Sequence, residues 1–240
     1  MPVNINKVYQ KVLALANKEQ RGYITPQEFN LFADHAQMEI FEQYFYDIEQ
    51  RQRGLGNELE YADIQENIEE KISYFEVYDE VSSLGSNGNV ILPTNLYKIG
   101  MVRVDYDSEP RLAFAERIKL NELNAFESPL TRRNKKRPVY NMISSANHGG
   151  KIQVFPNPIT PDRVLISYIL NPNKPNWAYV ISGENALFNP NGSINFELHS
   201  SEENKLVIKI LALAGVAIKD VQLAQVAAGK DASITQQQKQ

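Results

Sequence analysis

Cysteine is absent from all 240 residues of this sequence. Its absence excludes disulfide scaffolds, zinc sites built from thiolates and cysteine nucleophiles, and it fits synthesis in a reducing cytoplasm. The N-terminus also lacks the basic segment followed by an apolar stretch that marks a secretory signal. The longest apolar run, Ile210–Ile218, is about half of the roughly 20 residues that cross a bilayer. We therefore expect a soluble protein that makes no contact with membranes.

A strong excess of charge of one sign is missing as well. The chain has 25 Lys and Arg against 29 Asp and Glu, which gives a formal net charge of -4. This balance offers no global electrostatic basis for wrapping nucleic acid or for lying on an anionic membrane. Any contact with nucleic acid must therefore be local. Hydrophobic residues make up 42% of the chain, enough for the core of one domain or of two closely connected ones.

Signatures of catalysis are also lacking. The sequence has no phosphate-binding glycine loop, no nucleophile elbow, no His-Glu-x-x-His helix and no dinucleotide fingerprint. The three histidines, His35, His148 and His199, have no second ligand at metal-binding spacing, so we interpret them as structural or surface residues. We accordingly expect no catalytic residue, no metal site and no cofactor, and we interpret the chain as a non-enzymatic protein.

Helix signals dominate the first third of the chain. A first helix is predicted to begin after Asn4, and a second to run from Thr25 to about residue 53. Thr25 is the expected N-cap of the second helix, Pro26 occupies its first position, and Glu28 closes a capping box. A third amphipathic helix is predicted to end at about residue 81, from the apolar positions Ile64, Ile68, Ile72 and Phe75.

The second helix carries apolar residues on two faces. One face holds Phe29, Phe32, Ala33, Ala36, Ile40 and Tyr44. The other face holds Leu31, Met38, Phe41 and Phe45. Two apolar faces need two partners, and monomers rarely leave such surfaces in water. We therefore predict that this second set contributes to an interface with a neighbouring subunit.

The middle of the chain has the pattern of β-structure. Residues 82–89 form a connector rich in Ser, Gly and Asn, and short strands separated by turn residues follow. The predicted strands are Val90–Leu92, Met101–Tyr106, Val139–Ile143, Lys151–Phe155, Val164–Leu170 and Trp177–Ile181. A weaker helical pattern in residues 111–126 does not decide their state. We predict a mostly antiparallel sheet or sandwich, whose edge strands offer further subunit contacts.

A long final helix is the clearest element of the sequence. Ser200 and Glu203 form a capping box, and apolar residues continue to about Ala228. This helix is expected to pack against the N-terminal helices. The predicted class is therefore α+β, with a helical bundle of residues 1–81 and 200–228 and an inserted, mostly antiparallel β-rich domain of residues 82–199. The polar, Gln-rich residues 229–240 are expected to form a flexible tail.

One concentrated basic segment lies between Pro129 and Pro138. Its cations are Arg132, Arg133, Lys135, Lys136 and Arg137. Such a segment contacts DNA phosphates or acidic residues of a partner, or it is simply a solvated loop, and the sequence leaves these alternatives open. Aromatic residues, which would indicate single-strand binding, do not interleave with these cations.

The order of these features resembles that of a known group of virion proteins. The segments that carry the resemblance precede the long final helix and are Tyr23–Asn30, Leu92–Leu96, Arg137–Tyr140, Lys151–Pro156 and Ile166–Pro172. Over roughly residues 5–228, the chain resembles structural proteins of the crAss-like phages and their marine relatives. More distantly, it is similar to the head-to-tail adaptor proteins (tail tubular protein A) of short-tailed phages. The shared segments are packing and turn signals, and none is a chemical signature.

The resemblance implies a ring of subunits in the neck of a virion, commonly of twelve copies, beneath the portal protein. Such a head-to-tail connector extends the DNA channel, contacts adjacent tail or ring proteins, and touches DNA non-specifically. A terminal tail that docks on the portal is also implied. The alternatives are another tail or capsid-associated virion protein, or a DNA-binding packaging accessory factor. A hydrolase is a third alternative, for which the sequence nominates no residue.

Overall fold

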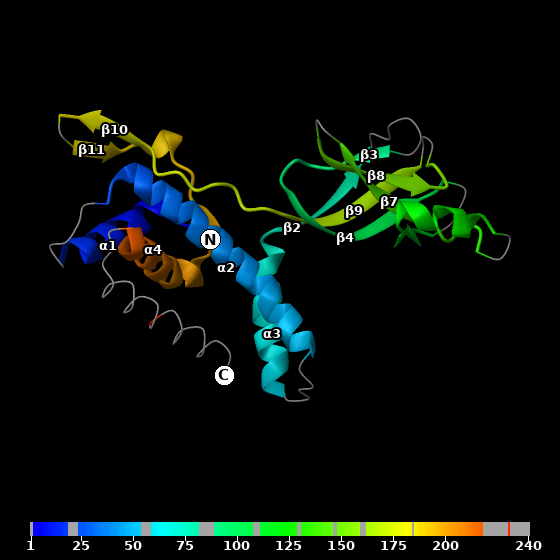
Figure 1. The fold of residues 1–240 in the computed structure, drawn as a ribbon, viewed down its shortest axis with the longest axis horizontal. Coiled ribbons are helices and arrows are strands. Elements are labelled where there is room, and N and C mark those ends of the chain that lie inside the picture. The colour runs from blue at the N-terminus through cyan, green and yellow to red at the C-terminus, as the bar shows by residue number, and fades with distance from the viewer. Residues whose placement is uncertain are drawn as a thin grey trace. The chain divides into compact units, whose positions relative to one another are not determined.

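A computed structural model describes residues 2–18, 24–53, 59–81, 89–107, 111–128, 131–145, 148–158, 162–183, 185–217 and 230 of the chain. The chain combines helices with several antiparallel sheets, which confirms the α+β class. It divides into two compact units, and Figure 1 labels their α-helices and many of their strands. Unit 1 comprises residues 1–74 and 172–240, and unit 2 comprises residues 75–171.

Unit 2 begins and ends earlier in the chain than the inserted domain expected at residues 82–199. Residues 76–81 pair with a strand of unit 2, and the strands that follow residue 172 pair within unit 1. The expected C-terminal tail, residues 229–240, lies outside the described residues apart from residue 230. The same holds for residues 218–228 of the expected final helix.

Four α-helices of the described residues lie in unit 1. They are α1 (Ile5–Lys18), α2 (Pro26–Arg53), α3 (Leu59–Ser73) and α4 (Glu203–Ala217). α4 packs against α1 and α2, and α2 also contacts α3. The residues of α1 and α4 that face this core, spaced three or four apart, are Val8, Val12, Leu206, Ile210 and Ala214. Among the described residues, none of the helices has the length and apolar character that crossing a bilayer requires.

The starts of α1 and α2 follow the predicted capping signals. Lys7 N donates a hydrogen bond to Asn4 Oδ1 at 3.1 Å. Glu28 N donates to Thr25 Oγ1 at 3.3 Å, and Thr25 N donates to Glu28 Oε2 at 2.9 Å. Pro26 occupies the first helical position of α2, where its missing N–H costs nothing. These contacts confirm the capping box and satisfy N–H groups that a helix start leaves unpaired.

Short strands and 3₁₀-helices complete unit 1. The pairs are β1 (Pro2–Val3) with β12 (Phe196–His199), and β10 (Tyr179–Ser182) with β11 (Asn185–Phe188). The 3₁₀-helices are η3 (Pro190–Gly192) and η4 (Ser200–Glu202), and η4 leads directly into α4. The predicted strand Trp177–Ile181 therefore overlaps β10, in unit 1.

Trp177 fastens the segment before β10 to the helices of unit 1. Its side chain is 3% exposed, and its ring centroid lies 4.1 Å from that of Tyr9 in α1. Its indole Nε1 donates to Asn6 Oδ1 at 3.1 Å. Asn30 of α2 pairs with its backbone, because Trp177 N donates to Asn30 Oδ1 at 2.7 Å and Asn30 Nδ2 donates to Trp177 O at 3.2 Å.

The predicted end of the third helix is wrong. α3 ends at Ser73, and the residues that follow form the strand β2 (Glu76–Val81). β2 pairs antiparallel with β9 (Arg163–Leu170) along its whole length. This long-range ladder of hydrogen bonds outweighs the local helical spacing that includes Phe75, since strand formation depends strongly on tertiary context.

Unit 2 consists of two four-stranded sheets. One has the strand order β2-β9-β4-β5, and the other has the order β3-β8-β7-β6. The remaining strands are β3 (Asn89–Ile91), β4 (Leu96–Asp105), β5 (Ala113–Phe114), β6 (Glu116–Arg117), β7 (Val139–Ser145) and β8 (His148–Phe155). All pairings are antiparallel except that of β6 with β7. Each strand predicted between residues 90 and 170 overlaps one of these strands.

The two sheets enclose the core of unit 2. Side chains from both sheets meet there, and the fully buried ones are Val90, Val104, Tyr106, Ile152, Val154, Val164 and Ile166. Residues 111–126, whose state the sequence did not decide, form β5, β6 and most of the 3₁₀-helix η2 (Leu120–Glu127). η2 lies just ahead of the basic segment in the chain.

Candidate functional site

The basic segment of unit 2 folds as a tight turn. Arg137 N donates to Asn134 O at 3.0 Å, and Asn134 N donates to Arg137 O at 3.4 Å. Asn134 Oδ1 also accepts from the backbone N–H groups of Lys136 at 3.0 Å and Arg137 at 2.9 Å. Asn favours such turns because its side chain can bind the backbone two residues further on. We refer to residues 131–138 as the basic turn.

Two hydrogen bonds anchor the basic turn to η2. Thr131 Oγ1 donates to Ala125 O at 2.5 Å, and Arg133 N donates to Phe126 O at 3.2 Å. In a further backbone hydrogen bond, Thr131 N donates to Ser128 O at 3.1 Å, just ahead of the turn. The backbone that carries the cations is therefore held by contacts within unit 2.

Two of the five cations lie on aromatic rings of their own unit. The guanidinium carbon of Arg133 is 4.8 Å from the ring centroid of Phe155, and Lys135 Nζ is 5.4 Å from that of Tyr106. Tyr106 is buried, and its hydroxyl donates to Pro156 O at 2.7 Å. Burial raises the pKa of Tyr106 above its usual value, so the ring under Lys135 stays neutral. Cation–π contact orients both cations, and this sets them apart from the other three.

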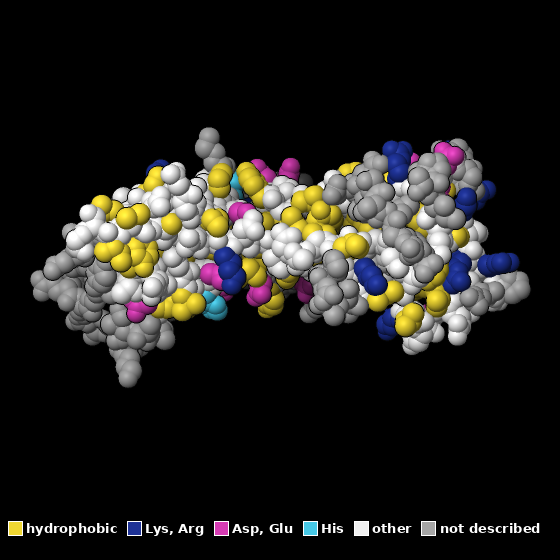
Figure 2. All heavy atoms as spheres, turned by 90° about the horizontal axis from the view of Figure 1, so that it is seen from above, with side chains coloured by type: hydrophobic (Ala, Val, Ile, Leu, Met, Phe, Trp, Pro, Cys, Tyr) yellow, Lys and Arg dark blue, Asp and Glu magenta, His cyan; other side chains and the backbone are white. Residues whose placement is uncertain are grey.

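Arg132, Lys136 and Arg137 are exposed. Within the described part of the chain, none of the three forms an ion pair. By sequence, unit 2 holds 12 Lys and Arg against 10 Asp and Glu, whereas unit 1 holds 13 against 19. Figure 2 shows Lys and Arg side chains over the visible face of unit 2. The basic turn is therefore a local anion-attracting site in an acidic chain.

A cavity of about 410 Å³ lies beside the basic turn. Its lining residues are Phe114, Glu116, Phe126, Thr131, Arg137, Pro138 and Val139. The lining residues thus include one acidic, one basic and two phenylalanine residues, and the volume of the cavity falls within the range of about 300–1,000 Å³ usual for small ligands. Sequence spacing could not reveal this cavity, because Phe114 and Arg137 are far apart in the chain.

Arg103 of β4 holds the Phe114 ring from one side. Its guanidinium carbon lies 5.9 Å from the ring centroid of Phe114 and 5.0 Å from that of Tyr78 in β2. Arg103 Nη2 also donates to the Tyr78 hydroxyl at 2.6 Å. These contacts keep Phe114 in place at the wall of the cavity, although its side chain is 62% exposed. No local sequence pattern indicates this cluster, because its residues come from three different strands.

The four residues of α2 predicted to meet a neighbouring subunit lie in different environments. Leu31 is 68% exposed, while Met38 and Phe45 are partly buried. Phe41 is fully buried and contacts the Phe45 ring edge-on, at a centroid distance of 5.0 Å. α2 packs against both α3 and α4, so Phe41 belongs to the core of its own unit, where a neighbour cannot reach it. Leu31 is the member of the set that stands open to another chain.

Exposed apolar side chains also lie on the hairpin of β10 and β11. Val180 and Leu187 are directly opposite each other and are each 55% exposed, and Ile181 is 71% exposed. Figure 2 shows hydrophobic side chains gathered on the part of unit 1 that carries this hairpin. Within the described residues, β10 and β11 pair only with each other. Open strand edges and exposed apolar side chains are typical of surfaces that bind another chain.

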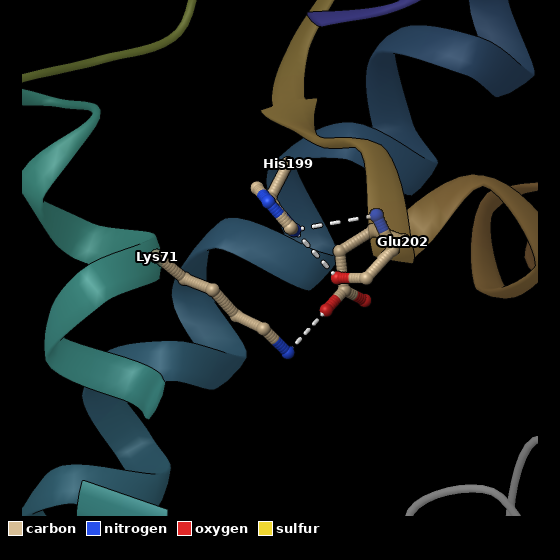
Figure 3. Close-up of polar contacts among 4 residues, drawn as sticks. Lys71, His199 and Glu202 are labelled. Carbon is tan, nitrogen blue, oxygen red and sulfur yellow. Dashed lines mark hydrogen bonds and ion pairs between the residues drawn. The ribbon is translucent and has the colours of Figure 1, made fainter. Parts of the chain in front are cut away.

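A buried ion pair joins α3 to η4 in unit 1, as Figure 3 shows. Lys71 Nζ lies 2.6 Å from Glu202 Oε1. Beside this pair, His199 Nδ1 lies 2.8 Å from Ser201 Oγ and accepts from Ser201 N at 3.3 Å. A nucleophilic triad would have its carboxylate on the imidazole, but here the carboxylate binds a lysine and the imidazole caps η4. We therefore interpret these residues as structural contacts that hold α3 against η4.

The described residues offer three kinds of contact: anion binding at the basic turn, a mixed polar and aromatic cavity, and apolar surface on the hairpin. Among these residues, no three of His, Asp or Glu are grouped so as to hold a metal ion.

No family model matches the chain, and no curated protein matches it.

Proposed function

We propose that this chain is a structural subunit of a bacteriophage virion, a non-enzymatic head-to-tail connector that forms a ring beneath the portal and extends the DNA channel. The proteins that the sequence resembles set the expected ring at twelve copies. In this assembly α1, α2, α3 and α4 form a helical bundle, and unit 2 provides the β-rich part that faces adjacent tail or ring proteins. The site of action is the neck of the virion.

The exposed apolar surface of unit 1 is the observation that carries this proposal. Leu31 and the hairpin residues Val180, Ile181 and Leu187 are all more than half exposed. Covering apolar surface is worth about 25 cal/mol per Å², and a two-stranded hairpin has little stability by itself. A neighbouring copy that covers the hairpin would bury its apolar side chains and would also stabilise its two strands. In a closed ring, one face of each copy meets a different face of the next, so the hairpin need not meet another hairpin.

Imaging and protein identification on purified particles test the proposal. Mass spectrometry should find the chain in the virion, and electron microscopy should show ring density beneath the portal. A particle made with Val180→Ser and Leu187→Ser should lack the ring, because the hairpin can no longer exclude water from the contact. Leu120→Ser is the matched control, since Leu120 is 70% exposed on η2 of unit 2. Absence of the chain from purified particles would sink the proposal.

The exposed cations of the basic turn support a second candidate, a DNA-binding packaging accessory factor. Three exposed cations in a fixed turn can contact phosphates, and each contact makes the dependence of DNA affinity on salt steeper. Changing Arg132, Arg133, Lys135, Lys136 and Arg137 to Ala should then abolish salt-sensitive binding of duplex DNA. A factor of this class would be absent from the mature particle, which separates it from the connector. Another tail or capsid-associated virion protein would be present but would show density outside the neck.

A further inference from the structure

The cavity beside the basic turn brings together the groups that hold a nucleotide. Phe114 and Phe126 line it, and so does the guanidinium-bearing Arg137. Arg132 and Lys136 are exposed on the same turn. We propose that this cavity binds a single unpaired nucleotide whose base carries an exocyclic amino group. The proposal concerns unit 2 alone and does not depend on ring assembly.

Phe114 provides the stacking surface. Its strand β5 pairs with β4 through Arg103 opposite Phe114, and the Arg103 guanidinium lies over the Phe114 ring at 5.9 Å. The ring is therefore positioned before a ligand arrives, yet it remains 62% exposed. A pre-positioned aromatic side chain gives up little conformational freedom when a base stacks on it. Base stacking on aromatic residues is the usual source of affinity for unpaired nucleotides.

Arg137 provides the contact to phosphate. It lines the cavity, and within the described residues it forms no ion pair. Its backbone is fixed by the two bonds to Asn134 O and Oδ1, at 3.0 and 2.9 Å. Guanidinium groups bind phosphate through paired N–H donors. Arg132 and Lys136 lie on the same turn, where they can bind the next phosphates of a single-stranded nucleic acid.

Glu116 decides which base the cavity accepts. Its backbone is fixed, because Glu116 N donates to Pro138 O at 3.0 Å and β6 pairs with β7 at Val139. An ionised carboxylate only accepts hydrogen bonds, so it repels the phosphate and the carbonyl oxygens of thymine. The amino groups of cytosine, adenine and guanine are donors that it can accept. The ligand is therefore oriented with its amino group at Glu116 and its phosphate at Arg137.

A protein side chain fits this charge arrangement less well. A Lys or Arg of a partner would bind Glu116 but would be repelled by Arg137 and by the other exposed cations of the turn. An Asp or Glu of a partner would bind Arg137 but would be repelled by Glu116. An amino-bearing nucleotide has a donor at one end, an anion at the other and a flat apolar body between them. It satisfies both charged residues and both rings at once.

Fluorescence anisotropy with labelled single strands tests the proposal on the full chain. The probes are oligodeoxycytidine and oligothymidine of about five nucleotides, at about 50 mM and about 200 mM salt. The cytidine strand is expected to bind about tenfold more tightly, since one specific base contact has that value. Glu116→Met should bring the ratio of the two affinities close to one. Glu42→Met, at an exposed position of α2 in unit 1, should leave the ratio unchanged.

Two further variants separate stacking from charge. Phe114→Leu should weaken both strands by about tenfold or more without changing the dependence on salt. Arg137→Ala should reduce the salt dependence for both strands, whereas Lys7→Ala on α1 should not. The ratio between strands is measured on the same folded sample, so partial unfolding of a variant cannot imitate its loss. Equal affinity for the two strands in the unaltered chain, or no binding of either, would overturn the proposal.

Discussion

Lys71 of α3 and Glu202 of η4 form an ion pair with a separation of 2.6 Å between Nζ and Oε1, and the Glu202 side chain is only 1% exposed. Tyr44 of α2 lies close enough for the charge of this carboxylate to affect its pKa. Burial raises the pKa of Tyr44 above its usual value, and the negative charge of Glu202 raises it further. The phenol of Tyr44 therefore stays neutral, and Lys71 is the cation that is paired with the Glu202 carboxylate.

Lys71→Met is expected to destabilise the protein by about 3 kcal/mol, because it leaves the buried Glu202 carboxylate without a counter-charge. Replacing both residues, with Lys71→Met and Glu202→Leu together, should recover much of this loss, since the buried carboxylate is then removed together with its partner. Urea unfolding followed by circular dichroism measures both. If the double variant were as unstable as the single one, the cost would come from packing and not from the unpaired charge.

Acid should selectively weaken the start of α2. Hydrogen bonds from the backbone and the hydroxyl of Thr25 lower the pKa of Glu28 below its usual value. The Glu28 carboxylate therefore binds a proton less well in the folded state than in the unfolded state. As a result, Glu28 stabilises the fold at pH values above its unfolded pKa of about 4.3. That contribution is lost as the pH falls through the lower, folded pKa. The melting temperatures of the wild-type chain and of Glu28→Gln should therefore converge between about pH 6 and about pH 3. A constant difference would contradict this assignment.

Signals that act over a few residues were the ones that sequence could predict. The capping box of Thr25 and Glu28 spans a single helical turn, and it marks the observed start of α2. The end of α3 was missed because β2 is stabilised by β9, almost ninety residues further along the chain. No local pattern distinguishes residues 76–81 from another turn of amphipathic helix.

The same limit applies to the candidate site. The cations of the basic turn are adjacent in sequence, so their composition alone identified them. Their division into stacked and exposed sets depends on Phe155 and Tyr106, which come from other parts of the chain. Phe114 lies in β5 and Glu116 in β6, and these two strands belong to different sheets. Both residues line the cavity, and no local sequence pattern indicates this position. The aromatic component that is missing between the cations in the sequence is therefore supplied by the fold.

Gln37 of α2 bridges two backbone segments, and its removal should be costly. Its side chain is 0% exposed. Gln37 Nε2 donates to Asn173 O at 2.8 Å, and Glu197 N donates to Gln37 Oε1 at 3.1 Å. Gln37→Leu leaves both partners without these bonds and should destabilise the protein by about 2–4 kcal/mol. Gln43→Leu, at a partly exposed position of the same helix, should change the stability by less than about 1 kcal/mol. Chemical denaturation compares the two, and equal losses would contradict the bridging role.

Gly100 of β4 permits a close approach between β4 and β9. A Cβ atom at this position would lie 2.6 Å from Ser167 Oγ and 3.2 Å from Ser167 O. The register of the two strands shifts between Ile99 and Val102, and Met101 N donates to Ser167 Oγ at 3.2 Å inside that irregularity. Any side chain at residue 100 must therefore displace Ser167 or open the ladder.

Gly100→Ala is expected to destabilise the protein by about 1–3 kcal/mol, in the range usual for overpacking. Ser167→Ala removes the nearest atom, so this second substitution should cost less in the Gly100→Ala background than in the wild-type chain. The double-mutant cycle should give a coupling of about 0.5–2 kcal/mol, measured by urea unfolding. Additive losses would mean that the added methyl group meets the backbone and not the serine hydroxyl. A Gly100→Ala chain as stable as the wild type would show that β4 and β9 do not approach this closely.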